Sequence, residues 1–199
     1  MPIIKPTAQP TPGSHAKAQG FTLIELMVTV SIAAILVALA TPSIRGMIMN
    51  NRIQAASTEF QSALFIARAE AIKRGGDARV TVVANAQSGG VPDWASGLTV
   101  FVDTTTNANG NAPPTNASTL IMTTGAVSAD VLAVVNFNHL IYNGLGRSIN
   151  SAGAALAGTA AFGAVDADYR CTVISATGRV RSIRVTSAAF AALPGCPTN

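Results

Sequence analysis

Few side chains in this sequence have the chemistry of a catalytic or metal site, and they are scattered. The 199 residues contain two histidines, His15 and His139, and nine carboxylates that no regular spacing pairs. General acid–base and metal sites need several such groups together, and a phosphate-binding loop needs glycines that lead into a helix. The sequence therefore predicts a non-enzymatic protein with no cofactor and no metal, and His139 is expected at a strand end, on the surface or in the core.

The two cysteines, Cys171 and Cys196, are groups to which the sequence does assign a chemistry. They lack Cys-x-x-Cys spacing, and the chain has too few histidines to complete a zinc site with them. We therefore expect a structural disulfide between them, formed in an oxidising compartment. Closing a loop of this size stabilises the folded chain by about 3 kcal/mol in the chain-entropy account.

An apolar segment, Phe21–Ala40, lies near the amino terminus. It carries one charge, Glu25, and as a helix it would span about 30 Å, the hydrocarbon thickness of a bilayer. The whole chain is 49% hydrophobic and 11% charged, with a mean hydropathy of +0.39. These values exclude a disordered chain and an ordinary soluble domain. The segment is therefore predicted to enter a membrane.

Three ordinary explanations of this segment each leave part of it unexplained. A secretory signal would end in a small-residue cleavage site, which Ala38-Leu39-Ala40 imitates, but the apolar run is long and has an acid near its start. A plain membrane anchor leaves Glu25 inside the span at a cost of about 2 to 3 kcal/mol. A capping box, Thr22-x-x-Glu25, would start a helix but does not explain why apolar residues follow the acid directly.

The residues around Glu25 resemble a processing motif. Gly20-Phe21-Thr22-Leu23-Ile24-Glu25-Leu26 is similar to the cleavage and methylation motif of type IV pilin-like proteins. The resemblance implies that residues 1–20 are a leader, that prepilin peptidase cuts after Gly20 and methylates the new amino-terminal Phe21, and that Glu25 is the assembly residue. In an apolar filament core the Phe21 amine would need a charge partner, and Glu25 of a neighbouring subunit supplies one.

The helical pattern continues beyond Pro42. Apolar residues recur there at helical spacing, with charged residues on the opposite side, until Gly75-Gly76 ends the pattern after Arg74. We therefore predict one helix over 21–74, in which 21–40 is the transmembrane and assembly part, Pro42 introduces a kink, and the second half lies on a globular domain. The apolar stripe of that half consists of Ile53, Ala56, Phe60, Ala63, Leu64, Ala67 and Ala71.

After Gly76 the apolar period changes from helical to alternating, which indicates β-strands. Short strands separated by Gly, Asn and Pro turns are typical of an antiparallel sheet or a small sandwich. We therefore predict an α+β protein, in which the long amino-terminal helix packs on an antiparallel sheet or sandwich formed by residues 77–199. Polar loops are expected at Asp103–Ser118 and around Ser151–Ala161. The predicted strands are 78–83, 98–102, 131–137, 169–174 and 179–185, with a short one at 120–122.

Three later motifs extend the resemblance into the globular part. Trp94 with Gly97–Asp103, then Tyr142–Arg147, then Gly178–Arg181, are similar in order and spacing to the GspH/FimT family of minor pilins and pseudopilins. The resemblance implies other pilins or pseudopilins and prepilin peptidase as partners. It also implies a single-pass protein of the bacterial inner membrane with a periplasmic globular domain, which moves into a pilus or pseudopilus on assembly.

Four arginines, Arg170, Arg179, Arg181 and Arg184, lie in the last thirty residues, although the net charge of +4 alone says little about partners. Gly178-Arg179-Val180-Arg181 resembles the motif with which FimT-type minor pilins bind DNA, and the resemblance implies that Arg179 and Arg181 contact phosphates of double-stranded DNA. Strand alternation puts these two on one face and Arg184, the weaker candidate, on the other. Arginines on an exposed edge strand also prevent unwanted sheet pairing, and this alternative stays open.

The sequence thus favours a minor pilin of a type IV pilus, placed in the filament or at its tip, with DNA binding as an added role. A minor pseudopilin of a type II secretion system is the first alternative. The second is a membrane-anchored DNA-binding module that is not polymerised.

Overall fold

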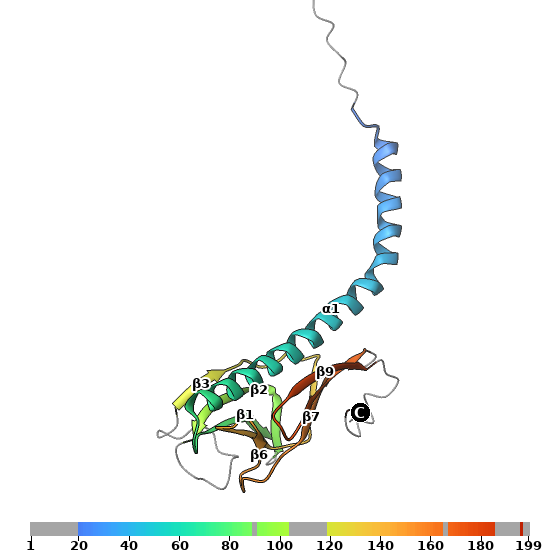
Figure 1. Ribbon diagram of the computed structural model, residues 1–199. Coiled ribbons are helices and arrows are strands. Elements are labelled where there is room, and N and C mark those ends of the chain that lie inside the picture. The colour runs from blue at the N-terminus through green and yellow to red at the C-terminus, as the bar shows by residue number, and fades with distance from the viewer. Residues whose placement is uncertain (1–19, 89–90, 104–118, 165–166, 186–195, 197–199) are drawn as a thin grey trace, which may run out of the picture. The chain divides into compact units, whose positions relative to one another are not determined.

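The computed structural model describes residues 20–88, 91–103, 119–164, 167–185 and 196 (Figure 1). The expected leader, up to residue 19, and the expected polar loop after Asp103 lie outside these residues. The chain divides into two compact units, Met1–Pro42 and Ser43–Asn199. The second unit begins well before residue 77, because the second half of the long helix contributes to the core of the β-rich domain.

Helix α1 spans Leu23–Arg74, within two residues of the predicted bounds. A capping box begins it: the Thr22 N–H donates to the Glu25 carboxylate at 3.1 Å, and the Glu25 N–H donates to Thr22 Oγ1 at 3.2 Å. The helix ends where Gly75 and Gly76 adopt φ values of 62° and 55°, a region that favours glycine.

In the first unit, the described turns of α1 leave their apolar side chains exposed. Phe21 is 86% exposed and Leu39 is 72% exposed. No single helix in the described part of the chain is both long and apolar enough to cross a membrane, whereas the pieces Leu23–Leu39 and Ile44–Arg74 reach that length and composition when combined. A continuous apolar helix surface needs lipid or protein to cover it.

In the second unit, two antiparallel sheets accompany the helix, so the predicted α+β class is confirmed. The first sheet has the strand order β3-β2-β1-β5-β6 and the second has the order β4-β7-β8-β9. The strands are β1 (Arg79–Ser88), β2 (Val91–Asp103), β3 (Thr119–Thr123), β4 (Leu132–Val135), β5 (His139–Asn143), β6 (Ser148–Ile149), β7 (Gly158–Gly163), β8 (Tyr169–Ile174) and β9 (Val180–Val185).

The core of this unit lies between α1 and the two sheets (Figure 1). All seven residues of the predicted apolar stripe are buried and belong to this core. Phe60 connects the layers: its ring lies 5.8 Å from Trp94 of β2 and 5.3 Å from Phe162 of β7, measured between ring centroids. Trp94 in turn meets Phe137 edge to face at 5.4 Å.

The loop expected around Ser151–Ala161 is wrong in its second part, because strand β7 begins there at Gly158. Its Gly and Ala residues lack the β-branched side chains that are typical of strands. At Gly158 the small residue is required by the neighbouring ring of Phe137. A Cβ on Gly158 would lie 2.5 Å from Cδ1 of Phe137.

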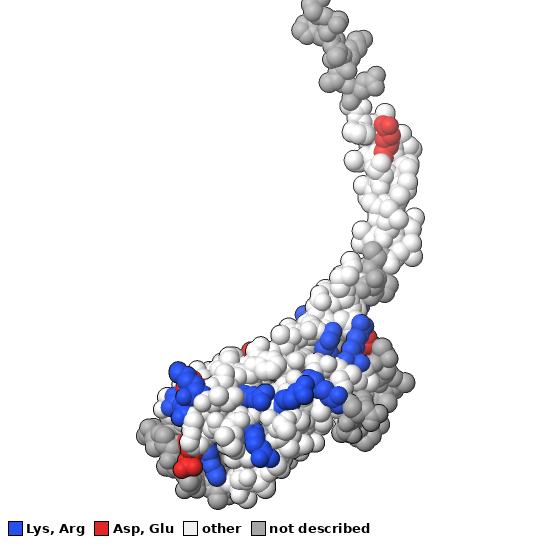
Figure 2. All heavy atoms as spheres, in the orientation of Figure 1, with Lys and Arg blue, Asp and Glu red and all other residues white. Residues whose placement is uncertain are grey.

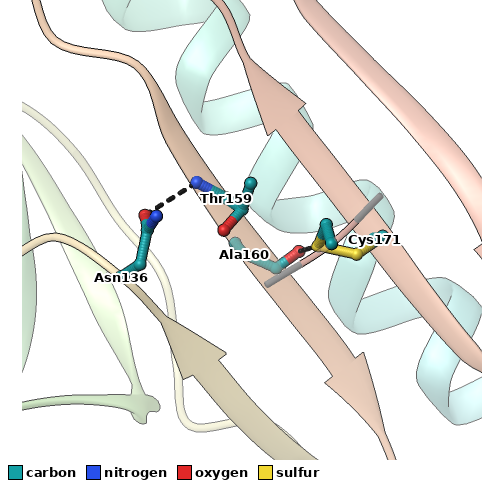
Figure 3. Close-up of a disulfide and its surroundings, with 5 residues drawn as sticks. Asn136, Thr159, Ala160 and Cys171 are labelled. Atoms are coloured by element: carbon teal, nitrogen blue, oxygen red, sulfur yellow. Dashed lines mark hydrogen bonds between the residues drawn. A yellow bond between two sulfur atoms is a disulfide. The ribbon is translucent and has the colours of Figure 1, made fainter. Parts of the chain in front are cut away.

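The strand predicted at 131–137 is also too long, because β4 ends at Val135. The side-chain oxygen of the next residue, Asn136, accepts a hydrogen bond from the Thr159 N–H at 2.8 Å (Figure 3).

Two further strands, β5 and β6, were not predicted from the sequence. β5 pairs with β1 over the register Arg79–Val83 and completes the burial of Tyr142 in the core. β6 is only two residues long, which is below the length at which an alternating pattern can be recognised.

Replacing Phe60 by Ala is expected to lower the free energy of unfolding by about 3 to 5 kcal/mol, because it opens a cavity between helix and sheets. Phe65→Ala on the same helix is the control, since that ring is 51% exposed and its loss should cost about 0.5 kcal/mol. Denaturant unfolding followed by the fluorescence of Trp94, the one tryptophan of the chain, measures both. Equal losses for the two variants would contradict the described core.

Candidate functional site

The expected processing site lies in non-helical backbone directly before α1. Gly20 and Phe21 are both exposed, and apart from its chain neighbours no described residue lies within 4 Å of a Cβ built on Gly20. A peptidase must bind its substrate in an extended form, so the absence of helix at this bond leaves it open to cleavage. The structure therefore places the predicted cut at an accessible position.

The carboxylate of Glu25 is only partly used by the helix start. Both the backbone N–H and the hydroxyl of Thr22 donate to one of its oxygens, Oε2, each at 3.1 Å. The second oxygen, Oε1, has no hydrogen-bond partner among the described residues. The capping box and an assembly contact are thus compatible, because one oxygen holds the helix start and the other can accept from an external amine.

Strand β9 carries the predicted DNA-binding residues at the edge of the second sheet. Arg181 pairs in register with Val173 of β8, and Arg179 lies one residue before β9 begins. Both arginines are exposed and line one groove of about 520 Å³. The rest of this groove is formed by Ala157, Val173, Ile174, Ser175, Ala176, Thr177 and Val180.

Arg184 does not join them. It alternates to the other face of β9, where its guanidinium donates to the Asp168 carboxylate, with the Nε contact at 3.0 Å and a second contact from the terminal nitrogen. It also faces Arg170 across the strand pair. The structure therefore brings Arg179 and Arg181 together and leaves Arg184 in an ion pair on the opposite face.

The glycine of the Gly178-Arg179-Val180-Arg181 motif has a structural role. Gly178 closes a tight turn with Ser175, since its N–H donates to the Ser175 carbonyl at 2.8 Å, and it adopts a φ of 77°. A Cβ at this position would overlap the carbonyl oxygen of Gly146. The turn before β9 therefore packs directly against the turn between β5 and β6, and only glycine at position 178 allows this contact.

Arg68 of α1 holds these two turns together. Its Nε donates to the Gly146 carbonyl at 3.0 Å, and its NH2 group donates to the Thr177 carbonyl at 3.3 Å. One guanidinium thus connects the helix, the first sheet and the turn that carries Arg179. The helical pattern does not indicate this role, because Arg68 is one of the charged residues outside the apolar stripe, for which the pattern predicts only exposure.

Cys171 and Cys196 form a disulfide, with their Cα atoms 5.6 Å apart (Figure 3). Both are buried, and the Cys196 sulfur lies 3.7 Å from the Ala160 carbonyl oxygen. Together with Ala161 they form a small apolar cluster on the face of β8 that carries Val173 and not Arg170. The bond therefore fixes position 196 against the second sheet, beside the strand that bears Arg181.

His139 begins β5 and is half-buried, and neither ring nitrogen has a hydrogen-bond partner among the described residues. Burial lowers the pKa of this imidazole, so it stays neutral. No group of three or more histidine, cysteine or carboxylate side chains could hold a metal in the described part of the chain. These observations place His139 at the start of β5 as a packed, neutral side chain.

The amino-terminal motif, the long helix and the two antiparallel sheets define a pilin-like protein. The model of the prokaryotic N-terminal methylation motif matches residues 15–41. The model of type II transport protein GspH matches residues 56–178, which is more than half of the chain. The chain therefore belongs to the GspH family, as a minor pilin or pseudopilin of a type IV pilus or type II secretion system, and is a structural, non-enzymatic protein. Family membership implies other pilins and prepilin peptidase as partners.

Two solved structures of a minor pilin are similar to this chain. A crystal structure of the type IV minor pilin FimU from Pseudomonas aeruginosa is similar at 20% identity and a TM-score of 0.50, over 65% of this chain and 91% of that one. A second crystal form of FimU matches at 19% identity and a TM-score of 0.49, over 66% and 88% of the two chains. A comparison with curated proteins finds no match.

Gly178→Ala is expected to lower the free energy of unfolding by about 2 kcal/mol or more, because alanine is strained at this φ and its methyl group would meet Gly146. Gly125→Ala is the matched control, since nothing lies within 4 Å of its added Cβ, and its effect should stay within about 0.5 kcal/mol. Denaturant titration of the two variants measures the difference. A Gly178→Ala variant as stable as the control would refute the structural role of this glycine.

Proposed function

We propose that this chain is an inner-membrane precursor that is cut after Gly20, methylated at Phe21, and assembled as a minor pilin into a type IV pilus or its tip. The carboxylate of Glu25 carries the proposal, because it stands in an exposed apolar helix and only one of its oxygens has a hydrogen-bond partner in the described part of the chain. Cleavage creates an amine at Phe21 that would be costly to bury alone. Each group is the natural charge partner of the other between neighbouring subunits.

A second observation supports assembly through α1. The flank of its second half that points away from the core carries no charge over seven turns, and large apolar side chains stand exposed on it, among them Met47 at 64%, Phe65 at 51% and Ile72 at 50%. An uncharged helix flank packs readily against another helix. This stripe consists of Met47, Asn51, Gln54, Thr58, Ser62, Phe65, Ala69 and Ile72.

The environment of the globular unit follows from the same proposal. The apolar run is a single-pass anchor before assembly, and the unit from Ser43 lies on the periplasmic side. A buried disulfide in this unit is typical of an oxidising compartment, which the periplasm provides. A pseudopilin of a type II secretion system is the second candidate, favoured by the GspH description that matches residues 56–178.

Glu25→Ala should leave membrane insertion and leader cleavage intact and reduce incorporation into filaments at least tenfold, because the buried amine loses its partner. Glu25→Gln should behave in the same way, since it keeps the shape and removes the charge. Thr22→Ala is the control: it removes the hydroxyl donor of the capping box and keeps the carboxylate. Immunoblots of sheared filaments and of membranes measure the two pools.

Normal amounts of Glu25→Ala in the filament fraction would overturn the assembly role. Wild-type chain that stays in the membrane and never enters filaments would instead favour a membrane-anchored module that is not polymerised.

We further propose that Arg179 and Arg181 bind the phosphates of double-stranded DNA. The groove that both arginines line supports this. Figure 2 shows that Lys and Arg side chains form a band across the visible face of the globular unit, with few acids among them. Tyr169 is the one aromatic residue on β8 and β9, so base stacking on this sheet has little support and backbone contact is favoured. Two phosphate contacts give a salt slope of about −2 and weak binding, so several subunits would have to act together.

The double variant Arg179→Ala with Arg181→Ala should abolish the gel shift of a DNA duplex by the detergent-solubilised full chain at low salt. Arg170→Ala is the matched control, because it removes an arginine from the other face of the same sheet. An unchanged shift in the double variant would leave these arginines the role of protecting the strand edge.

A further inference from the structure

The start of β6, in the first sheet, adjoins the groove that Arg179 and Arg181 line. Ser148, the first residue of β6, is completely buried. Its Oγ lies within hydrogen-bond distance of two carbonyl oxygens, that of Leu156 at 2.6 Å and that of Ser175 at 2.8 Å. Ser175 lines the groove, and so does the residue that follows Leu156. The start of β6 is therefore anchored to the wall of this groove.

Arg147 lies between two residues that are fixed in this way. Ser148 follows it, and Gly146 precedes it. A Cβ on Gly178 would overlap the carbonyl oxygen of Gly146, so the backbones of the two turns are in direct contact. Arg147 is therefore held beside the turn that carries Arg179, although one turn belongs to the first sheet and the other to the second.

The turn that carries Arg147 is held by hydrogen bonds that do not use its side chain. Oδ1 of Asn143 accepts from the Leu145 N–H at 3.1 Å and from the Arg147 N–H at 3.0 Å. The Gly146 N–H donates to the Asn143 carbonyl at 2.8 Å. The Arg147 side chain is exposed, and it has no hydrogen bond or ion pair among the described residues. This arginine thus combines a fixed backbone with a charge that is free to meet an external anion.

The charge around the groove is positive. Arg179 is exposed, and its guanidinium also has no partner in the described part of the chain. The residues that line the groove include Arg179 and Arg181 and no acid. With Arg147 beside them, three guanidinium groups lie around one groove. Such a concentration of positive charge attracts a polyanion.

We propose that Arg147 is a third residue that binds the phosphates of double-stranded DNA, so that the binding surface extends from β9 onto the turn between β5 and β6. The inference rests on the proposed DNA binding by Arg179 and Arg181 and adds one contact from the other sheet. A guanidinium can hold two oxygens of one phosphate through parallel N–H contacts. Phosphate contacts carry no sequence information, so duplexes of different sequence bind alike.

The salt dependence of DNA binding counts these contacts, because each one adds about −0.9 to the slope of log K against log salt concentration. The wild-type chain should give a slope of about −3, and Arg147→Ala a slope of about −2 with weaker binding at every salt concentration. Arg147→Lys should keep the wild-type slope, because it keeps the charge. Fluorescence anisotropy of two labelled duplexes of different sequence, titrated with the detergent-solubilised full chain, measures the slopes.

Arg170→Ala is the matched control, because it removes one arginine from the face of the second sheet that does not line this groove. Its slope should equal that of the wild type. Arg147→Glu should bind more weakly than Arg147→Ala, because it places a carboxylate beside the phosphates. Denaturant unfolding of Arg147→Ala should match that of the wild type, since the backbone N–H at this position keeps its bond to Asn143.

A wild-type slope in Arg147→Ala would overturn this inference. An equal fall in slope for Arg147→Ala and Arg170→Ala would also overturn it, because only the loss of net charge would then matter. The double variant Arg179→Ala with Arg181→Ala tests the proposed DNA binding separately. A lost gel shift in the double variant together with an unchanged slope in Arg147→Ala would keep that proposal and remove the third contact. An unchanged shift in the double variant would remove both.

Discussion

The packing of the second half of α1 against both sheets is the constraint on which the rest of the molecule depends. Three alanines, Ala63, Ala67 and Ala71, are completely buried in this contact, where their small side chains belong to the core that the helix shares with the strands. Phe60 fills the wider part of the same interface between Trp94 and Phe162. This contact fixes the rotation of α1 about its own axis. It thereby determines which side chains of the helix face outward.

The same interface explains why Arg170 and Arg184 lie on a different face of the second sheet from Arg181. Residues of β8 and β9 alternate, so one face carries Arg170 and Arg184 toward α1 while the other carries Arg181 toward the disulfide cluster. A change of register by one residue would exchange the two sets. The Cys171–Cys196 bond holds one face of this sheet and the buried side chain of Ile174 holds the other, so the register is strongly specified.

The long helix, its apolar stripe and the strands rich in Val, Ile and Thr could be predicted, because apolar residues recur with a different period in a helix than in a strand. Strand β7 could not be predicted. Its first residue, Gly158, has to be small because the ring of Phe137 packs against it, and sequence spacing does not reveal that contact. Local motifs are enough to propose the carboxylate of Glu25 and the pair Arg179 and Arg181 as candidate site residues. The role of Arg68 could not be predicted, because it joins segments that are about a hundred residues apart in the chain.

The way in which Arg68 holds the two turns affects how the protein can evolve. It binds backbone carbonyls, those of Gly146 and Thr177, and no side chain of either turn. The neighbouring positions, such as Leu145 with 79% exposure, can therefore change their chemistry while the framework stays anchored. Related subunits could thus acquire different ligands at these tips without redesigning the scaffold beneath them.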